Sequence, residues 1–128
     1  MSDSKITRLT RAEEQVMKII WDLKEANVKK IVNSFELPRP AYTTVATVLK
    51  VLEKKEFVSN EKKGNILYYR AVVSKNEYTK FQLSNLLVNY FNGSFPKMAT
   101  FFAKENDISI NELEEIINEA REELDKEA

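Results

Sequence analysis

The sequence contains no histidine and no cysteine, and only two of its 128 residues are glycine. Without histidine or cysteine the chain cannot build a Ser-His-Asp or Cys-His catalytic site, a haem held by histidine, or a disulfide. Zinc sites that use these ligands are excluded for the same reason. Gly64 and Gly93 each stand alone, whereas phosphate-binding loops need several glycines in one short turn. We therefore expect a protein that is not an enzyme and has no cofactor or metal ion.

Long apolar runs are also missing. No stretch is apolar enough to cross a bilayer, and the first residues lack the apolar core of a signal peptide. Together with the absence of cysteine, this predicts a cytoplasmic protein that is not inserted in a membrane. A chain of this length can form one compact domain or two small modules.

Charge is balanced over the whole chain but not along it. The sequence has 20 Lys and Arg residues and 20 Asp and Glu residues. Residues 1–80 hold 16 basic and 10 acidic side chains, a net charge of +6, whereas residues 81–128 hold 4 and 10, a net charge of −6. This pattern indicates two parts with different partners, and it predicts that the basic part faces a polyanion.

Three helix starts share one capping box, in which Ser or Thr precedes Glu by three residues and both side chains satisfy backbone N–H groups. The boxes lie at Thr10–Glu13, Ser74–Glu77 and Ser109–Glu112. Apolar residues at helical spacing follow each box and predict helices over about 11–24, 74–92 and 110–126. The first of these helices would bury Ala12, Val16, Ile19, Ile20 and Leu23.

Two more helices are predicted between the first two boxes. A short one covers about 29–35, and a second covers 41–55 after a stop at Pro38-Arg39-Pro40. The second helix is split into two faces. Its buried face has Val45, Val48, Leu49 and Leu52, and its outward face has Thr43, Thr47, Lys50 and Lys54, with Thr44 and Ala46 at the edges.

A hairpin is expected after these helices. The runs 57–61 and 66–73 are rich in β-branched and aromatic residues, and Gly64 lies in the turn that joins them. Helix, helix, helix, hairpin is the order of a winged helix. The predicted fold is thus mainly α with a small β-hairpin wing, followed by C-terminal helices.

A winged helix can place its third helix in the DNA major groove while its wing reaches the phosphates. Small Thr and Ala side chains can contact thymine methyl groups, Lys side chains can contact phosphates, and a nearby Arg can contact guanine. We therefore predict double-stranded DNA with T/A-containing steps as the partner. The predicted DNA-binding residues are Arg39, Thr43, Thr44, Ala46, Thr47, Lys50, Lys54, Lys62 and Lys63.

The C-terminal part is rich in apolar and aromatic residues. One short helix over 96–104 and a terminal helix are too little to cover the apolar surface of helix 74–92, which predicts a two-fold dimer. We expect a winged-helix DNA-binding domain over 1–73 and a helical dimerisation region over 74–128. The predicted dimerisation residues are Tyr78, Phe81, Leu86, Leu87, Tyr90, Phe91, Phe95, Phe101, Phe102, Leu113, Ile116 and Ile117.

Two other functions fit the residues less well. A winged-helix module could bind a protein through helix 41–55 without touching DNA, but the basic charge of residues 1–80 opposes this. The many carboxylates of the last helix could suggest a metal-dependent nuclease. A solvated helix face explains them better, and we assign no catalytic or metal-binding residue.

Six segments of the sequence share the pattern of one known family. They are Leu9-Thr10-Arg11-Ala12-Glu13, Val16-Met17-Lys18-Ile19-Ile20-Trp21, residues 44–55, Tyr68-Tyr69, Asn92-Gly93-Ser94-Phe95 and residues 105–109. Together these segments resemble the penicillinase repressor family (BlaI/MecI/CopY type). The resemblance implies a homodimeric winged-helix repressor that silences β-lactam resistance genes from a palindromic operator. It also implies relief by proteolysis in the C-terminal region, through a pathway that starts at a membrane sensor-protease.

A few positions depart from the pattern of that family. Ala46 stands where a basic residue is usual in the recognition helix, and Glu56 stands where a glycine is usual. The Asn-Phe bond cleaved in the family falls at Phe101-Phe102, which the resemblance implies as the cleavage position. Copper-sensing members bind metal through C-terminal cysteines. Since this chain has none, the resemblance is to the β-lactam-resistance branch.

Overall fold

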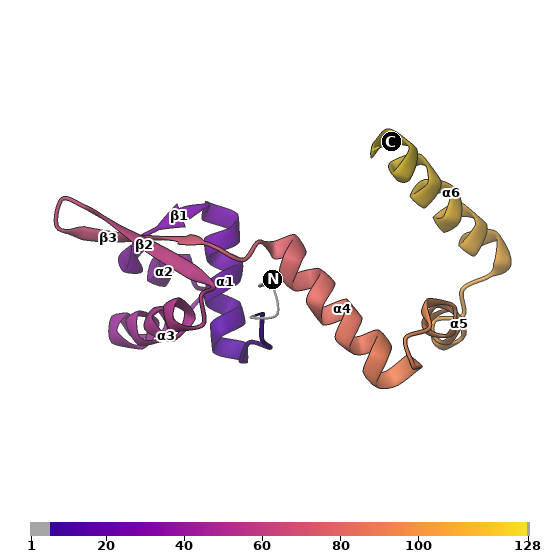
Figure 1. The fold of residues 1–128 in the computed structure, drawn as a ribbon, viewed down its shortest axis with the longest axis horizontal. Helices are drawn as coiled ribbons and strands as arrows, with labels where there is room; N and C mark the ends of the chain where they lie inside the picture. Colours follow the sequence, from indigo (N-terminus) through magenta and orange to yellow (C-terminus); the bar gives the residue numbers. More distant parts are fainter. Residues whose placement is uncertain (1–5, 128) are drawn as a thin grey trace. The chain divides into compact units, whose positions relative to one another are not determined.

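The computed structural model describes residues 6–127, and this part of the chain forms six helices and three strands (Figure 1). It divides into two compact units, one that ends at Gln82 and one that begins at Leu83. The predicted fold class, mainly α with a small β wing, is confirmed. In chain order the elements are α1 (Arg11–Leu23), β1 (Glu25–Ala26), α2 (Val28–Ser34), α3 (Tyr42–Lys54), β2 (Val58–Lys63), β3 (Ile66–Ala71), α4 (Lys75–Phe91), α5 (Phe95–Glu105) and α6 (Ile110–Glu127).

The three predicted capping boxes are present. The Thr10 hydroxyl accepts a hydrogen bond from the Glu13 backbone N–H at 3.2 Å, and the Glu13 carboxylate accepts one from the Thr10 N–H at 2.9 Å. The same reciprocal bonds join Ser74 to Glu77 and Ser109 to Glu112, at distances between 2.8 and 3.1 Å. Helices α1, α4 and α6 consequently start within one residue of their predicted positions.

The core of the first unit is formed by α1, α2, α3, the sheet and the start of α4. Burial of a large apolar side chain stabilises a fold by roughly 1.5–3 kcal/mol, so the apolar faces of α1 and α3 fix how these helices pack. The prediction that Ala12 is buried is wrong, because the capping box turns Glu13 inward instead. The largest fully buried side chains are Phe57, Met17, Ile20, Ile31, Leu49, Leu52, Val16 and Val45.

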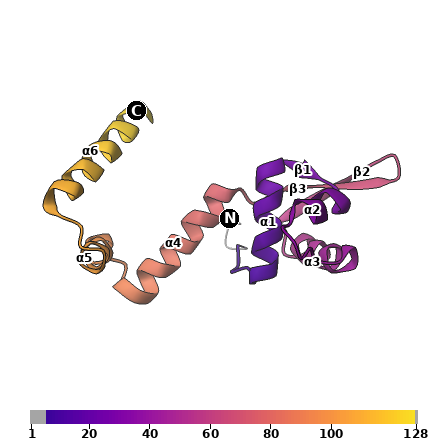
Figure 2. The same cartoon turned by 180° about the vertical axis from the view of Figure 1, so that it is seen from behind.

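The three strands pair antiparallel in the order β1-β3-β2. Strand β1 places Glu25 opposite Arg70 and Ala26 opposite Tyr69. The sequence predicted β2 and β3 but not β1, because two residues between helices carry no periodic pattern. We call β2, β3 and their turn the wing, and its tip extends beyond α2 and α3 in both ribbon views (Figures 1 and 2).

The turn from α3 into the wing uses a left-handed residue. Glu56 has φ +66°, the Phe57 N–H donates to the Leu52 carbonyl at 2.9 Å, and the Glu56 N–H donates to the Glu53 carbonyl at 3.0 Å. These two bonds define a Schellman motif, which satisfies the last carbonyls of the helix and usually has glycine at the left-handed position. The motif therefore forms here with a side chain at the position where glycine has no steric cost.

The second unit consists of the end of α4 with α5 and α6. Phe91 of α4 and Phe101 of α5 are in contact, with ring centroids 5.7 Å apart. A groove of about 630 Å³ between α5 and α6 is lined mainly by apolar residues, among them Ala103, Leu113 and Ile117. No described side chain of α5 or α6 is buried. Within residues 6–127, no helix is both long and apolar enough to cross a membrane.

Candidate nucleic-acid interface

Helix α3 is held to the core by one face and exposes the other. Val45, Leu49 and Leu52 are at most 1% exposed, so they fix the orientation of the helix. The predicted DNA-binding residues Thr43, Thr44, Thr47, Lys50 and Lys54 are all exposed. Ala46 is partly buried and packs against the core cluster, which leaves only part of its surface for a contact.

Thr47 has its rotamer fixed by the helix itself. Its hydroxyl donates a hydrogen bond to the Thr43 carbonyl, four residues earlier, at 2.9 Å. Because the hydroxyl hydrogen is used in this bond, the oxygen can act only as an acceptor towards a ligand. Thr47 is thus left with an acceptor and a methyl group for contact, and a methyl group suits thymine.

Arg39 lies in the loop before α3 and is bound to the preceding helix. Its Nε donates to the Phe35 carbonyl at 3.1 Å, and its terminal nitrogen lies 3.4 Å from the Asn33 carbonyl. The carbonyls at a helix C-terminus attract a cation, so this guanidinium stabilises the end of α2. Its remaining N–H groups are exposed and stay available to DNA.

Tyr42 is a surface residue that is not among the predicted DNA-binding residues. It is the first residue of α3 and is 59% exposed. The N-terminal residues of a recognition helix are the ones that contact base edges. Its position immediately before Thr43, at the predicted start of the helix, is the sequence feature that could have identified Tyr42 as a candidate.

The two lysines at the tip of the wing lie on opposite faces, because side chains alternate along a strand. Lys62 shares its face with Asn60, which bonds to Glu53 of α3, and with the buried Tyr69. We call this the inner face, since it is the one towards α3. Lys62 forms no ion pair with any residue between 6 and 127.

Lys63 lies on the other face, which we call the outer face. Its ammonium is 2.9 Å from the Glu25 carboxylate and lies over the Tyr68 ring, 5.2 Å from the centroid. The structure therefore gives the two predicted wing lysines different surroundings. Lys62 has no ion-pair partner among the described residues, and Lys63 is held on the outer face.

Two of the predicted dimerisation residues contribute to the first unit. Tyr78 is only 4% exposed, its hydroxyl accepts a hydrogen bond from the Leu9 N–H at 2.9 Å, and its ring packs against Phe57 and Trp21. Phe81 stacks on Tyr78 with ring centroids 6.0 Å apart. Because Tyr78 is enclosed in this core, it is not available to a partner subunit.

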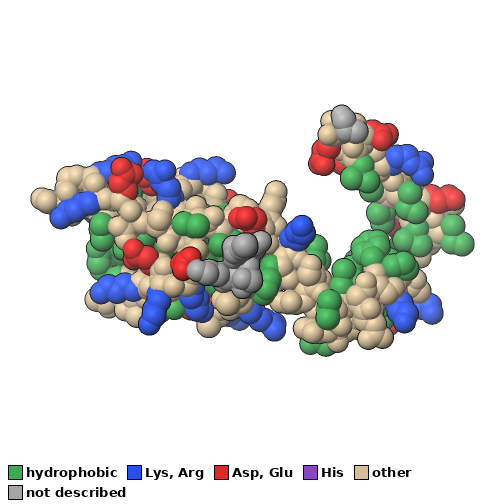
Figure 3. All heavy atoms as spheres, viewed as in Figure 1, with side chains coloured by type: hydrophobic (Ala, Val, Ile, Leu, Met, Phe, Trp, Pro, Cys, Tyr) green, Lys and Arg blue, Asp and Glu red, His purple; other side chains and the backbone are tan. Residues whose placement is uncertain are grey.

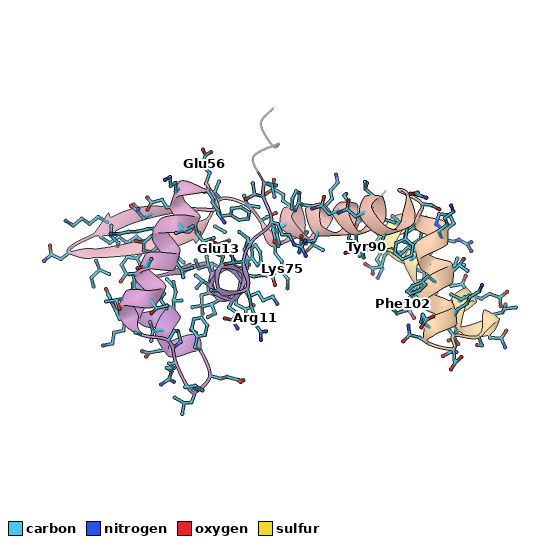
Figure 4. The ribbon with its side chains drawn as sticks, turned by 90° about the horizontal axis from the view of Figure 1, so that it is seen from below. Arg11, Glu13, Glu56, Lys75, Tyr90 and Phe102 are labelled. Carbon is cyan, nitrogen blue, oxygen red and sulfur yellow. The ribbon has the colours of Figure 1, made fainter. Side chains whose placement is uncertain are left out.

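The other predicted dimerisation residues form the apolar surface of the second unit. Figure 3 shows hydrophobic side chains gathered over α5 and α6. In Figure 4, Tyr90 of α4 and Phe102 of α5 both project into the angle between these two helices. Leu87, Phe91 and Leu113 are partly buried, and the exposed members are Leu86, Tyr90, Phe95, Phe101, Phe102, Ile116 and Ile117.

A helix anchored on an apolar core, with hydroxyl groups and cations outward and a basic wing beside it, defines the class of winged-helix DNA-binding proteins. Comparison with known proteins then gives the family. The chain matches the family described as penicillinase repressor over residues 9–122 and belongs to it. It is therefore a DNA-binding transcriptional repressor and not an enzyme, and the resemblance read from the sequence is confirmed.

Two relatives and one solved structure illustrate the similarity. The methicillin resistance regulatory protein MecI of Mammaliicoccus sciuri is 28% identical over 117 residues, covering 91% of this chain and 95% of MecI. The penicillinase repressor of Bacillus licheniformis is 28% identical over 121 residues, covering 90% and 93%. A structure of Lactococcus lactis ZitR aligns with a TM-score of 0.50 at 14% identity, covering 96% of this chain and 77% of ZitR, and supports the fold alone.

Proposed function

We propose that this repressor acts as a homodimer on a palindromic operator and controls β-lactamase or other antibiotic-resistance genes. The regulated genes are inferred from the printed names of its relatives, a methicillin resistance regulator and a penicillinase repressor. The observation that carries the DNA-binding mode is the exposed Thr and Lys face of α3, opposite the face that buries Val45, Leu49 and Leu52. Because it binds DNA, the repressor works in the cytoplasm.

The composition of the α3 surface supports a preference for thymine-containing steps. The outward face has no Arg, Asn or Gln, so it lacks the side chains that form bidentate contacts with guanine or adenine. The methyl groups of Thr43, Thr44 and Thr47 suit thymine, and Ala46 adds a small apolar contact. Arg39 and Tyr42, at the N-terminal end of the helix, would supply the polar contacts at the edge of each half-site.

The second unit supports dimerisation. No described side chain of α5 or α6 is buried within one chain, although Phe101, Phe102 and Ile117 are each more than half exposed. Apolar surface of this extent is stabilised when a second copy covers it. A two-fold axis would repeat α3 about one helical turn, ~34 Å, along one side of the DNA.

We propose that residues 1–73 bind DNA and that residues 74–128 contain the dimerisation surface. Helix α4 connects them, because its first turns are anchored on the winged helix by Tyr78 and Phe81. Its later residues, among them Leu86 and Tyr90, would then belong to the dimer surface. This arrangement makes one continuous helix the link between operator and partner subunit.

Relief of repression would follow proteolysis in the second unit, after a signal from a membrane sensor-protease. The implied cleavage position, Phe101-Phe102, lies in the interior of α5, and both side chains are more than half exposed. A protease needs an extended backbone, so cleavage there requires local unwinding of α5. Cutting this helix would separate α6 from α4 and weaken the dimer.

Selection of bound duplexes from a random pool tests this function. The expected product is a palindrome with T/A-containing half-sites one helical turn apart. A mobility shift at two salt concentrations should show affinity that falls steeply with salt, because phosphate contacts release counterions. If no sequence is selected and any association with DNA is independent of salt, the alternative of a winged-helix module that binds a protein is favoured instead.

A further inference from the structure

Glu25, the first residue of the short strand β1, bridges two cations of the wing. One carboxylate oxygen lies 2.9 Å from the Lys63 ammonium, and the other lies 3.0 Å from the Arg70 guanidinium. Strand pairing sets this geometry, because Glu25 is directly opposite Arg70 in the sheet. The main chain of β1 therefore holds a carboxylate against the outer face of the wing.

The carboxylate is ionised at neutral pH. Hydrogen bonds from Lys63 and from Arg70 lower the pKa of Glu25 below its ordinary value. All three side chains are partly exposed, with 29% of Glu25, 48% of Lys63 and 55% of Arg70 accessible. Ion pairs with this exposure contribute little to the stability of the fold, so the carboxylate can be removed without unfolding the wing.

Lys63 is the member of this cluster that lies nearest the tip of the wing. It is the last residue of β2 and is followed directly by the Gly64-Asn65 turn. Its side chain is held on the outer face by Glu25 and by the Tyr68 ring. A lysine at this place could reach a DNA phosphate beside the tip, but only after it leaves Glu25.

We propose that Glu25 is a positioning residue that competes with DNA phosphate for Lys63 and so sets how much charge the wing offers to DNA. This inference rests on the proposed approach of the wing to DNA. Phosphate contacts carry no sequence information, so the competition lowers affinity for operator and for unrelated duplex alike. It limits non-specific binding, while recognition by α3 is unchanged.

The test is Glu25→Gln in the full chain, with binding measured on the selected operator and on an unrelated duplex across a salt series. Release of Lys63 adds about one phosphate contact, so the plot of log affinity against log salt should become steeper by ~0.9. At low salt, affinity for both duplexes should rise by roughly three- to tenfold, since each contact adds to the electrostatic part of binding.

The matched control is Glu61→Gln. It removes the same charge from the same face, but within residues 6–127 Glu61 forms an ion pair with Arg70, at 3.4 Å, and none with Lys63. We expect this variant to change affinity by less than about twofold, as a surface charge at a distance does in salt. An equal gain in both variants would mean that net charge alone is responsible, and it would overturn the proposal.

Lys63→Ala, made alone and together with Glu25→Gln, locates the effect. Alone it should leave affinity nearly unchanged, and in the double variant it should abolish the gain. A gain that persists without Lys63, or Glu25→Gln binding no tighter than wild type, would overturn the inference. If wild type binds no duplex at all, the proposed function fails instead.

Thermal unfolding accompanies each binding measurement. Should Glu25→Gln unfold at lower temperature because β1 detaches, Glu25→Asp gives a milder test. The aspartate side chain is one methylene shorter, so its ion pair with Lys63 is weaker while the charge is kept. A smaller gain in the same direction supports the proposal, and no gain contradicts it.

Discussion

The Lys55 ammonium lies 2.8 Å from the Glu13 carboxylate, and this ion pair joins the start of α1 to the residue that ends α3. Glu13 is 7% exposed and also caps α1 through Thr10. Burial raises the pKa of Glu13, but the hydrogen bonds from Lys55 and Thr10 outweigh it, and the pKa is lower than its ordinary 4.5. One carboxylate thus helps to fix the helix that we propose faces DNA.

Glu13→Gln should destabilise the first unit by about 1–2 kcal/mol at pH 7, because it removes a charge-assisted hydrogen bond and weakens a cap. A group with a lowered pKa in the folded state stabilises above its unfolded pKa and loses that effect as pH falls through the folded value. The difference between wild type and variant should therefore shrink below about pH 4.5.

Urea unfolding at a series of pH values measures this difference. Glu14→Gln is the control, since the one ion pair of Glu14 within residues 6–127 is with the exposed Lys18 at 3.8 Å. Its effect should stay within about 0.5 kcal/mol at every pH. A Glu13→Gln variant as stable as wild type at pH 7 would show that the ion pair contributes nothing.

Glu56→Gly should stabilise the turn between α3 and the wing. Glu56 has φ +66°, and a side chain in this conformation costs roughly 1–2 kcal/mol, which glycine avoids. Part of that gain is lost because glycine gives the unfolded chain more freedom. We expect a net increase of about 0.5–1 kcal/mol in the free energy of unfolding, seen as a higher melting temperature.

Glu56→Ala separates the backbone effect from that of the carboxylate. It keeps the β-carbon, so the strain remains while the contacts of the carboxylate are lost. The alanine variant should be no more stable than wild type and less stable than the glycine variant. Equal stability of the alanine and glycine variants would mean that the left-handed conformation carries no cost here.

The wing lysines should differ in their effect on DNA binding. Lys62 is unpaired on the inner face among the described residues, so Lys62→Ala should weaken binding to all duplexes and reduce the salt slope by ~0.9. Lys63→Ala should have little effect, because Glu25 already holds Lys63 in the free protein. Salt titrations of both variants on one duplex decide the matter, and equal losses would contradict the difference between the two faces.

Thr47 should affect which sequence is bound more than how tightly DNA is held. Thr47→Ala removes the methyl group and the acceptor oxygen, and the cost of a lost base contact is ~1–3 kcal/mol at that position. Thr47→Val keeps a methyl group and removes only the oxygen. Competition between the operator and its single-base variants distinguishes the effects of Thr47→Ala and Thr47→Val. Unchanged selectivity in both proteins would show that Thr47 does not take part in base recognition.

Much of this architecture follows from local patterns in the sequence. Capping boxes need only side chains three residues apart, and they were predicted correctly. Helical spacing also predicted the buried face of α3 for Val45, Leu49 and Leu52, whereas Val48 is only partly buried. Strand β1 could not be predicted in this way. It exists because β3 pairs with Glu25 and Ala26, residues more than forty positions earlier in the chain.

Tyr78, which was predicted to contact a partner subunit, shows a second feature that local patterns in the sequence cannot predict. The apolar residues of α4 serve two surfaces, and periodicity alone does not tell where one ends and the next begins. The hydrogen bond from the Leu9 N–H to the Tyr78 hydroxyl joins residues 69 positions apart and places this ring in the first unit. The two faces of the wing were in principle predictable, since strand alternation separates Lys62 from Lys63 once the hairpin register is known.

Phe102→Asp should convert the dimer that we propose into a monomer. The side chain is 58% exposed on α5 and projects towards Tyr90 (Figure 4), so an aspartate there would place a charge in the apolar interface that we propose. Burying an unpaired carboxylate costs several kcal/mol, more than a typical interface residue contributes. Sedimentation at micromolar concentration should show a single chain.

Operator binding should weaken strongly in the same variant, because each half-site is then bound alone and the gain from simultaneous binding is lost. Melting of the winged helix should not change, since Phe102 lies outside the first unit. Lys97→Asp introduces the same carboxylate at an exposed position of α5 and serves as the control. A Phe102→Asp protein that sediments as wild type and binds the operator equally well would exclude this part of α5 from the dimer interface.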